Sequence, residues 1–551
     1  MRTFGNLLKG EIVTEGLPTG TFPNMEKVIQ APHILFASVL KSQGSFQRLM
    51  ARRFTGILPE KSPEMRLLKD HIKVHGWPEA TASEIADIQF AEFTIGNVKE
   101  TVIASEEASR IKGLMHRDLA KSGAGLTLEE RGESIAVMAK HMWKNYDDFK
   151  SIAIAEGTPL PLFEYQSTVF KALKSKAEVE FCTSRISSKE IPCTVKGERT
   201  ILHRYPFGAV GIFPPYNAAI GLGLLAIYSS YFAGNATVIR SPTRVPLTNM
   251  AVAYVLRDTM EEMDFPLSAF QAIIGPGKPI ANYMVSESPL DAMVYYGDSD
   301  VGLELMSKAV RRGMHFVPEL AGSGASLVWK DVDLDKVADH IIHGRFFGSG
   351  QTCLAVKRLF LHEAIFEDFI ALLCEKADKL RVGLPSDSKT DLPVIGTRAL
   401  YQIIDMIDEA LQKGANVETG GYRMNFAGEH DEAGLFYKPT ILTNVDFTCK
   451  MWYHETFGPV LPIMKIRNFK EAINQANNTS YGLRTSVYTD LPEIWGPFFD
   501  EIQAPGVCIN TDHLHMTDYT PHLGGLKASG VFGGKYFYEI LTYMKYRHFR
   551  A

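Results

Sequence analysis

The chain has 551 residues, of which 45% are hydrophobic and 22% are charged. This length exceeds what one simple hydrophobic core supports, so we expect two large domains or one multi-lobed subunit. The formal net charge of −5 provides no basic surface for nucleic acid, and no uncharged apolar run reaches the roughly 18 residues that span a bilayer.

The cysteines and the first residues further limit the class of protein that we expect. The six cysteines are scattered and none shows CxxC spacing, so neither a disulfide framework nor a zinc site is predicted. The first residues lack the apolar stretch of a signal peptide. We therefore expect a cytoplasmic protein with no metal, no nucleic-acid partner and no membrane partner.

Residues 1–125 contain no motif and are predicted to form an extension that is mostly helical. The first strong local signal follows, where Thr127 and Glu130 form a capping box. Ile135, Met138 and Met142 then recur at helical spacing. The sequence therefore predicts an amphipathic helix that begins at about residue 127.

Short β-rich runs alternate with helical stretches beyond this helix. The runs cover residues 209–213, 236–239, 272–274 and 292–296, and Gly or Pro follows each of them before a helical stretch. Such alternation is typical of a parallel doubly wound α/β sheet, which binds ligands at the carboxyl ends of its strands.

Cys353 stands out because it lies in a Gly- and Ser-rich segment, residues 347–356, downstream of Glu319. A thiol attacks well only as a thiolate, and a turn between a helix and a strand presents the backbone N–H groups that stabilise charge. The pair suggests a thiol nucleophile with a carboxylate base. The alternative is a buried cysteine that acts as a small hydrophobe.

Further segments accompany these two residues in a fixed order along the chain. They are Pro215-Tyr216-Asn217, Glu319-Leu320-Ala321-Gly322, Gly350-Gln351-Thr352-Cys353, Glu455-Thr456-Phe457-Gly458-Pro459 and Gly524-Gly525-Leu526-Lys527-Ala528-Ser529-Gly530. These resemble the PWN, ELGG, GQxC, ExFGP and GGxKxSG motifs of the aldehyde dehydrogenase superfamily. The resemblance extends from about residue 127 to residue 551.

The resemblance implies an aldehyde dehydrogenase-like α/β fold. A doubly wound, Rossmann-type cofactor domain would comprise residues 126–183 and 207–320, and an α/β catalytic domain residues 321–525. A small β element for oligomerisation would comprise residues 184–206 and 526–551. We therefore expect a homodimer or homotetramer.

The resemblance also implies a reaction, the NAD(P)-dependent oxidation of a small-molecule aldehyde to a carboxylic acid. Cys353 would add to the carbonyl carbon, and the Asn217 amide with the Cys353 backbone N–H would hold the oxyanion. After hydride transfer, Glu319 would activate the water that hydrolyses the thioester.

Cofactor contacts are implied in the same way. Glu455 resembles the residue that binds the nicotinamide ribose, and Phe457 resembles the ring that packs near the nicotinamide. Gly297 and Gly302 stand where the family's loop and helix N-terminus approach the pyrophosphate.

Departures from the family pattern concern the cofactor and the active-site loop. The acid that would grip a ribose 2'-hydroxyl is replaced by Thr243, which lies between Arg240 and Arg244, so we predict a preference for NADP over NAD. Asp298 stands next to the pyrophosphate position, where its charge would repel phosphate. Ala321 replaces a glycine, which would strain a backbone of positive φ.

Two alternatives stay open. In a CoA-acylating relative, CoA would replace water, although Glu319 would then have no water to activate. The second alternative is a non-catalytic protein that keeps the fold for binding or assembly. It is motivated by Asp298, Ala321 and the first 125 residues.

Overall fold

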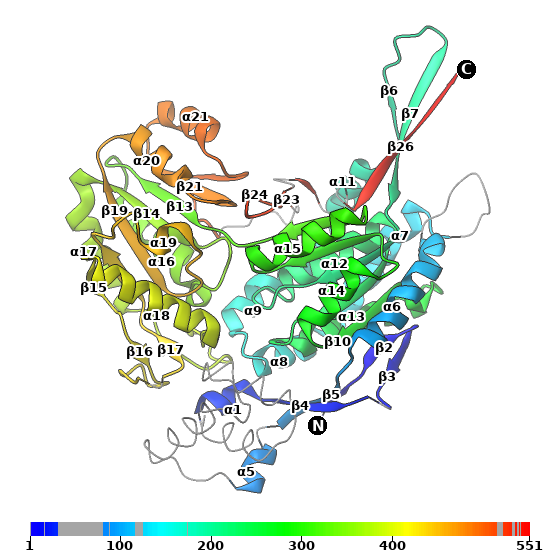
Figure 1. Ribbon diagram of the computed structural model, residues 1–551, viewed down its shortest axis with the longest axis horizontal. Coiled ribbons are helices and arrows are strands. Elements are labelled where there is room, and N and C mark those ends of the chain that lie inside the picture. The colour runs from blue at the N-terminus through cyan, green and yellow to red at the C-terminus, as the bar shows by residue number, and fades with distance from the viewer. Residues whose placement is uncertain are drawn as a thin grey trace.

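The computed structural model has two large lobes, each built around a seven-stranded sheet, and a narrow β element that projects from one lobe (Figure 1). The structure describes residues 2–15, 17–30, 81–87, 89–115, 125–173, 175–432, 434–514, 522–531, 535, 536, 539 and 541–550. No helix among these residues is long and apolar enough to cross a membrane.

The sheet of the first lobe has the order β12-β11-β8-β9-β10-β2-β3. Its parallel strands are β8 (Ala209–Phe213), β9 (Ala236–Ser241), β10 (Phe270–Ile274), β11 (Ala292–Tyr296) and β12 (His315–Glu319). The four predicted β-rich runs coincide with β8 to β11, and the connecting helices are α12 (Gly221–Ala233), α13 (Pro246–Glu262), α14 (Gly277–Ser286) and α15 (Ser299–Arg311). β8 to β11 are buried throughout, as expected for a sheet covered by helices on both faces.

The N-terminal residues complete this sheet, which the sequence did not lead us to expect. β2 (Asn6–Leu8) pairs antiparallel with β10, and β3 (Glu11–Val13) pairs with β2. The Asn6 side-chain oxygen accepts a hydrogen bond from the Ile274 N–H at 2.8 Å. These strands have three residues each, too few to show an alternating pattern.

The rest of the described N-terminal part also mixes strands with helices. A separate sheet has the order β1-β5-β4, and the elements are β1 (Arg2–Phe4), β4 (Thr19–Pro23), β5 (Gln89–Thr94), α1 (Met25–Gln30), α5 (Ala82–Asp87) and α6 (Val98–Ile111). α6 packs against β9 and β10 of the first lobe.

The predicted capping box is present at the start of α7 (Leu128–Lys144). The Thr127 hydroxyl accepts from the Glu130 N–H at 3.1 Å, and the Glu130 carboxylate accepts from the Thr127 N–H at 2.6 Å. Further helices follow along the chain: α8 (Tyr146–Ala155), α9 (Leu160–Ser167), α10 (Val169–Ala172) and α11 (Lys176–Ile186).

The sheet of the second lobe has the order β15-β18-β19-β14-β13-β21-β22, and every neighbouring pair is parallel except β15 with β18. Its strands are β13 (Gly324–Val328), β14 (Val356–His362), β15 (Asn416–Thr419), β18 (Thr440–Thr443), β19 (Val460–Ile466), β21 (Arg484–Tyr488) and β22 (Gly506–Ile509). Its helices are α16 (Leu334–Phe346), α17 (Phe366–Asp378), α18 (Thr397–Gln412), α19 (Lys450–Tyr453), α20 (Phe469–Asn477) and α21 (Pro492–Glu501).

The projecting element is a three-stranded sheet of order β26-β7-β6 (Figure 1). β26 (Thr542–Arg550) pairs antiparallel with β7 (Glu198–Pro206) along its whole length, and β6 (Lys189–Ile191) pairs with β7. The remaining short strands pair as β16 (Arg423–Met424) with β17 (Phe436–Tyr437), β20 (Tyr481–Gly482) with β24 (Leu526–Lys527), and β23 (His522–Leu523) with β25 (Lys535–Tyr536).

Candidate active site

Cys353 follows a turn whose backbone is left-handed at three successive residues. Gly348, Ser349 and Gly350 have φ values of 62°, 57° and 66°. Ser349 has a Cβ, so this conformation costs energy, and its hydroxyl donates a hydrogen bond to the Pro393 carbonyl at 2.7 Å. The turn lies between α16 and β14, and Cys353 follows it three residues before β14 begins.

Gly322 brings the segment after β12 against the Cys353 loop. A Cβ at this position would lie 2.5 Å from the Cys353 carbonyl oxygen, so only glycine allows this approach. The Gly322 N–H donates to Glu455 at 3.2 Å. The strain expected at Ala321 is absent because its φ is not positive, and its carbonyl accepts a hydrogen bond from the Ser529 hydroxyl at 2.6 Å.

Asn217 lies beside the same loop. Its side-chain amide donates to the Gln351 carbonyl at 2.9 Å, two residues before Cys353. Asn217 and Cys353 both line a cavity of about 110 Å³. Aromatic and aliphatic side chains form much of its wall, among them Leu162, Tyr165, Tyr216, Leu222, Phe347 and Leu514. The structure thus brings the predicted nucleophile and the predicted amide donor into one cavity.

Glu319 is the last residue of β12 and is almost fully buried, with 4% of its surface exposed. One carboxylate oxygen accepts a hydrogen bond from the Gly524 N–H at 2.6 Å, and the other has no hydrogen-bond partner among the described residues. Burial raises the pKa of Glu319 to about 7, although the Gly524 hydrogen bond and the charge of Arg484 oppose this rise. Such a carboxyl group can accept and release a proton near neutral pH.

The Cys353 thiol keeps its proton in this environment. Burial, together with the charges of Glu319 and Glu455, raises its pKa to about 12, while Lys357 and Arg484 oppose the rise. A base must therefore remove the thiol proton before attack. The charge of Glu319 is among the causes that raise the pKa of Cys353, so the two groups lie near one another.

Glu455 and Phe457 surround a buried lysine that the sequence did not reveal as a site residue. Lys357 is fully buried, 3.6 Å from the Glu455 carboxylate and 4.9 Å from the centre of the Phe457 ring. Burial raises the pKa of Glu455 and lowers that of Lys357. The signal that could have identified Lys357 as a site residue is its place in the buried strand β14, since a buried ammonium group needs a partner.

Tyr296 is a second residue near the site that the sequence did not reveal. It ends β11 and is the register partner of Glu319 on the neighbouring strand. Burial raises the pKa of its phenol, and the charges of Glu319 and Cys353 raise it further. Tyr296 therefore belongs to the group of side chains around the nucleophile.

The predicted pyrophosphate residues lie at the start of α15. Asp298 caps this helix, and its carboxylate accepts hydrogen bonds from the Asp300 and Val301 N–H groups at 3.1 and 3.2 Å. Its charge thereby stabilises the helix N-terminus. Gly297 is exposed at the end of β11, whereas Gly302 packs on Leu320 with no room for a Cβ.

Arg240 and Arg244 have different partners. The Arg240 guanidinium group is buried and donates to the Gly275 carbonyl at 3.1 Å through Nε. Thr243 lies in the turn between β9 and α13, and Arg244 lines the Cys353 cavity. The contact of these residues with the adenosine ribose stays a prediction.

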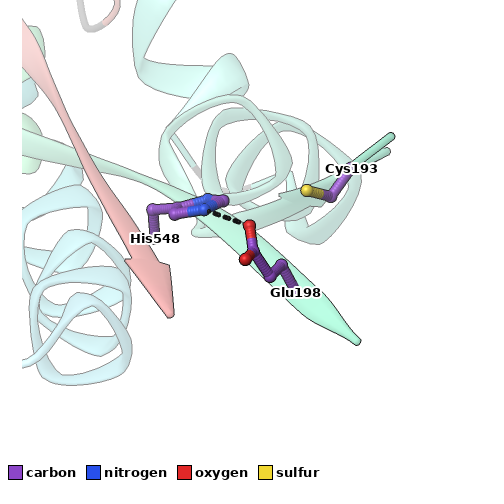
Figure 2. Close-up of side chains that lie close together, drawn as sticks. All are labelled: Cys193, Glu198 and His548. Carbon is purple, nitrogen blue, oxygen red and sulfur yellow. Dashed lines mark hydrogen bonds and ion pairs between the residues drawn. The ribbon is translucent and has the colours of Figure 1, made fainter. Parts of the chain in front are cut away.

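A cluster of metal-ligating residue types lies on the projecting sheet, outside the cavity (Figure 2). Ligand atoms of Cys193, Glu198 and His548 lie within 4.8 Å of one another. The His548 ring is hydrogen-bonded to Glu198 at 2.8 Å through Nε2 and to the Thr200 hydroxyl at 2.8 Å through Nδ1. These hydrogen bonds join β7 to β26.

Comparisons with known proteins show the family to which the chain belongs. The model of the aldehyde dehydrogenase family matches residues 98–549. A 3-sulfolactaldehyde dehydrogenase of Priestia aryabhattai is 32% identical over 342 residues, which cover 62% of this chain and 68% of that protein. An NADP-dependent glyceraldehyde-3-phosphate dehydrogenase of Streptococcus equinus is 26% identical and covers 88% of this chain and 96% of its own length.

Solved structures share the fold. A glyceraldehyde-3-phosphate dehydrogenase of Methanocaldococcus jannaschii, complexed with NADP, has a TM-score of 0.73 and 26% identity over 83% of this chain and 95% of its own. Aldehyde dehydrogenase 21 of Physcomitrella patens has a TM-score of 0.78 and 21% identity over 100% of this chain and 98% of its own.

The match to the family begins at residue 98, the start of α6, rather than near residue 127, so the resemblance covers more of the chain than its motifs indicated. The chain belongs to the aldehyde dehydrogenase family and is an NAD(P)-dependent oxidoreductase of that family.

Proposed function

We propose that the enzyme oxidises a small aldehyde to the free carboxylic acid, with Cys353 as nucleophile, Asn217 as oxyanion donor and Glu319 as the base for hydrolysis. The observation that carries this proposal is the buried carboxylate oxygen of Glu319, which has no hydrogen-bond partner among the described residues and belongs to a group with a pKa of about 7. A base of that pKa suits hydrolysis at neutral pH.

Cys353 releases its thiol proton to water and its sulfur bonds to the carbonyl carbon, so the carbonyl oxygen becomes an oxyanion that the Asn217 amide and the Cys353 N–H stabilise. Loss of the aldehyde hydrogen as hydride leaves a Cys353 thioester. Glu319 then takes a proton from water, and the hydroxide adds to the thioester carbon. The carbon–sulfur bond breaks to release the acid and the Cys353 thiolate, which takes the proton back from Glu319.

The chain's own residues fit a nicotinamide cofactor. Glu455 and Phe457 would hold the nicotinamide half, and both are linked to the Cys353 segment, Glu455 through the Gly322 N–H and Phe457 through Lys357. Gly297 and Gly302 would lie along the pyrophosphate, where Asp298 is already engaged as a helix cap. When bound, the cofactor supplies the acceptor for the hydride.

We also propose NADP as the preferred cofactor, because Thr243 removes the carboxylate that would repel a 2'-phosphate. Because Arg240 is buried, Thr243 is the main support for a preference for NADP. The NADP dependence of the Streptococcus equinus relative is consistent with this preference.

The oligomeric state, the domain division and the location are proposals of the same kind. The projecting sheet exposes Met544 and Tyr546 by 62% and 75%, which favours burial against another copy of the chain in a homodimer or homotetramer. Residues 126–183 and 207–320 would form the cofactor domain, residues 321–525 the catalytic domain, and residues 184–206 and 526–551 the oligomerisation strands. The six free cysteines favour the cytoplasm.

The direct test is a screen of aldehydes with NAD and NADP that follows the absorbance of the reduced cofactor and identifies the product. We expect reduction without added CoA and a free acid as product. Reduction that depends on CoA would assign the acylating reaction instead, and a folded protein that reduces neither cofactor with any aldehyde would favour a binding or assembly role.

A further inference from the structure

Arg244 lines the cavity that contains Cys353 and Asn217. Its position in the wall has no role in the steps above, since neither attack on the carbonyl nor hydrolysis needs a cation there. The side chain is only partly buried, so it faces the cavity without being sealed in the core. A cation beside a reacting carbonyl group can select substrates by charge.

The guanidinium group is held on three sides. Its central carbon lies 4.0 Å from the centre of the Tyr216 ring, and one of its nitrogens donates to the Gln351 side-chain oxygen at 3.2 Å. It also packs on Gly396, where a Cβ would not fit, and the Gly396 N–H donates to the same Gln351 oxygen at 3.1 Å. This bracing reduces the rotamer entropy that binding would cost.

The wall of the cavity around Arg244 has low polarity, because much of it is aliphatic or aromatic. Glu156, the acidic residue among the described residues of the lining, directs its carboxylate to the start of α13, where it accepts from the Leu247 N–H at 2.6 Å and from the Thr248 N–H at 2.9 Å. Low polarity strengthens the interaction between charges.

We propose that Arg244 binds an oxyanion group of the substrate, so that the aldehyde this enzyme oxidises carries a carboxylate, sulfonate or phosphate. A guanidinium group suits such oxyanions because its planar fork can donate two parallel hydrogen bonds. The proposal rests on the proposed function for the identity of the reacting group.

The anion and the reacting group share one cavity. Gln351, which accepts the Arg244 hydrogen bond, lies two residues before Cys353, and all three residues line this cavity.

The test compares two aldehydes that differ only in charge, 4-oxobutanoate and its neutral amide, 4-oxobutanamide. The wild type should prefer the anion by kcat/KM, and Arg244→Gln should lower the ratio of anion to amide by about 10- to 100-fold, the usual worth of a hydrogen bond between charged groups. Arg244→Lys should lower the ratio less. Arg467→Gln, which removes an exposed arginine paired with Glu363, should leave the ratio unchanged.

A second measurement needs no turnover. Calorimetry should show that succinate binds the wild type and that Arg244→Gln weakens this binding by a similar factor. If neither aldehyde is oxidised but succinate binding still depends on Arg244, the proposed reaction fails and the anion site stands.

Three results would overturn the anion site. The wild type could show no preference between the two aldehydes, Arg244→Gln could lower both rates equally, or it could raise only the KM for NADP. The second result would assign Arg244 a structural role under the Cys353 loop, and the third would return it to the cofactor.

Discussion

Glu319→Gln separates the two halves of the proposed reaction. Gln has nearly the same shape, and its amide oxygen can still accept the Gly524 N–H that now binds the carboxylate at 2.6 Å. The side chain can no longer take a proton from water. We therefore expect one equivalent of reduced cofactor to form rapidly, followed by turnover that is roughly 100- to 10,000-fold slower than in the wild type.

The pH dependence gives a second measure of the same residue. The base must be deprotonated to act, and burial raises the pKa of Glu319 to about 7, so wild-type hydrolysis should fall as pH falls through about 7. One unit below that pKa, only about a tenth of the carboxyl groups are ionised. In Glu319→Gln this inflection should be absent from steady-state turnover.

Stopped-flow and steady-state measurements of reduced cofactor, from pH 5.5 to 9 as an approximate range that brackets the pKa, test both statements. Glu493→Gln, which changes an exposed glutamate of α21, is the matched control and should behave as wild type. Undiminished turnover in Glu319→Gln, or an inflection that survives the substitution, would refute the assignment of this base.

Three other substitutions test the remaining parts of the site. Cys353→Ala should abolish the rapid formation of reduced cofactor, while cofactor binding, measured by fluorescence, should persist. Cys374→Ala is the control and should remain active. An active Cys353→Ala enzyme would refute the mechanism. Thr243→Glu should lower the ratio of kcat/KM for NADP to that for NAD by about 10-fold or more, because a carboxylate would oppose the 2'-phosphate; an unchanged ratio would mean that the ribose site is elsewhere. Gly322→Ala should slow the first equivalent of reduced cofactor, since its Cβ would lie 2.5 Å from the Cys353 carbonyl oxygen, whereas Gly496→Ala has open space and serves as control; equal rates in the two variants would contradict the close approach.

Much of the fold could be predicted because its signals are local. The capping box at Thr127 and the buried runs that became β8 to β11 each depend on a few adjacent residues. β2 and β3 could not be predicted in this way, because three residues carry no period and their pairing depends on β10, more than 260 residues away in sequence, as the 268-residue separation of Asn6 and Ile274 shows.

The candidate site could also be predicted only where its residues carry a local sequence signal. Cys353, Asn217 and Glu319 stand in recognisable motifs, and the structure places the first two in one cavity. The direction of a side chain in a turn has no local signal, so the contact of Arg244 with the Tyr216 ring could not be predicted. The capping role of Asp298 could have been predicted from the sequence, since an aspartate that precedes a helix commonly caps it.

The pairing of β2 with β10 has a consequence for how the protein is made. β2 is synthesised long before β10 and cannot take its place in the sheet until β10 has been made, and closing so long a loop is slow. In the interval between the synthesis of β10 and the docking of β2, β10 has an open edge that can pair with another chain. A bulky fusion partner before residue 2 would prolong the interval, so the yield of folded enzyme should depend on which end of the chain carries a purification tag.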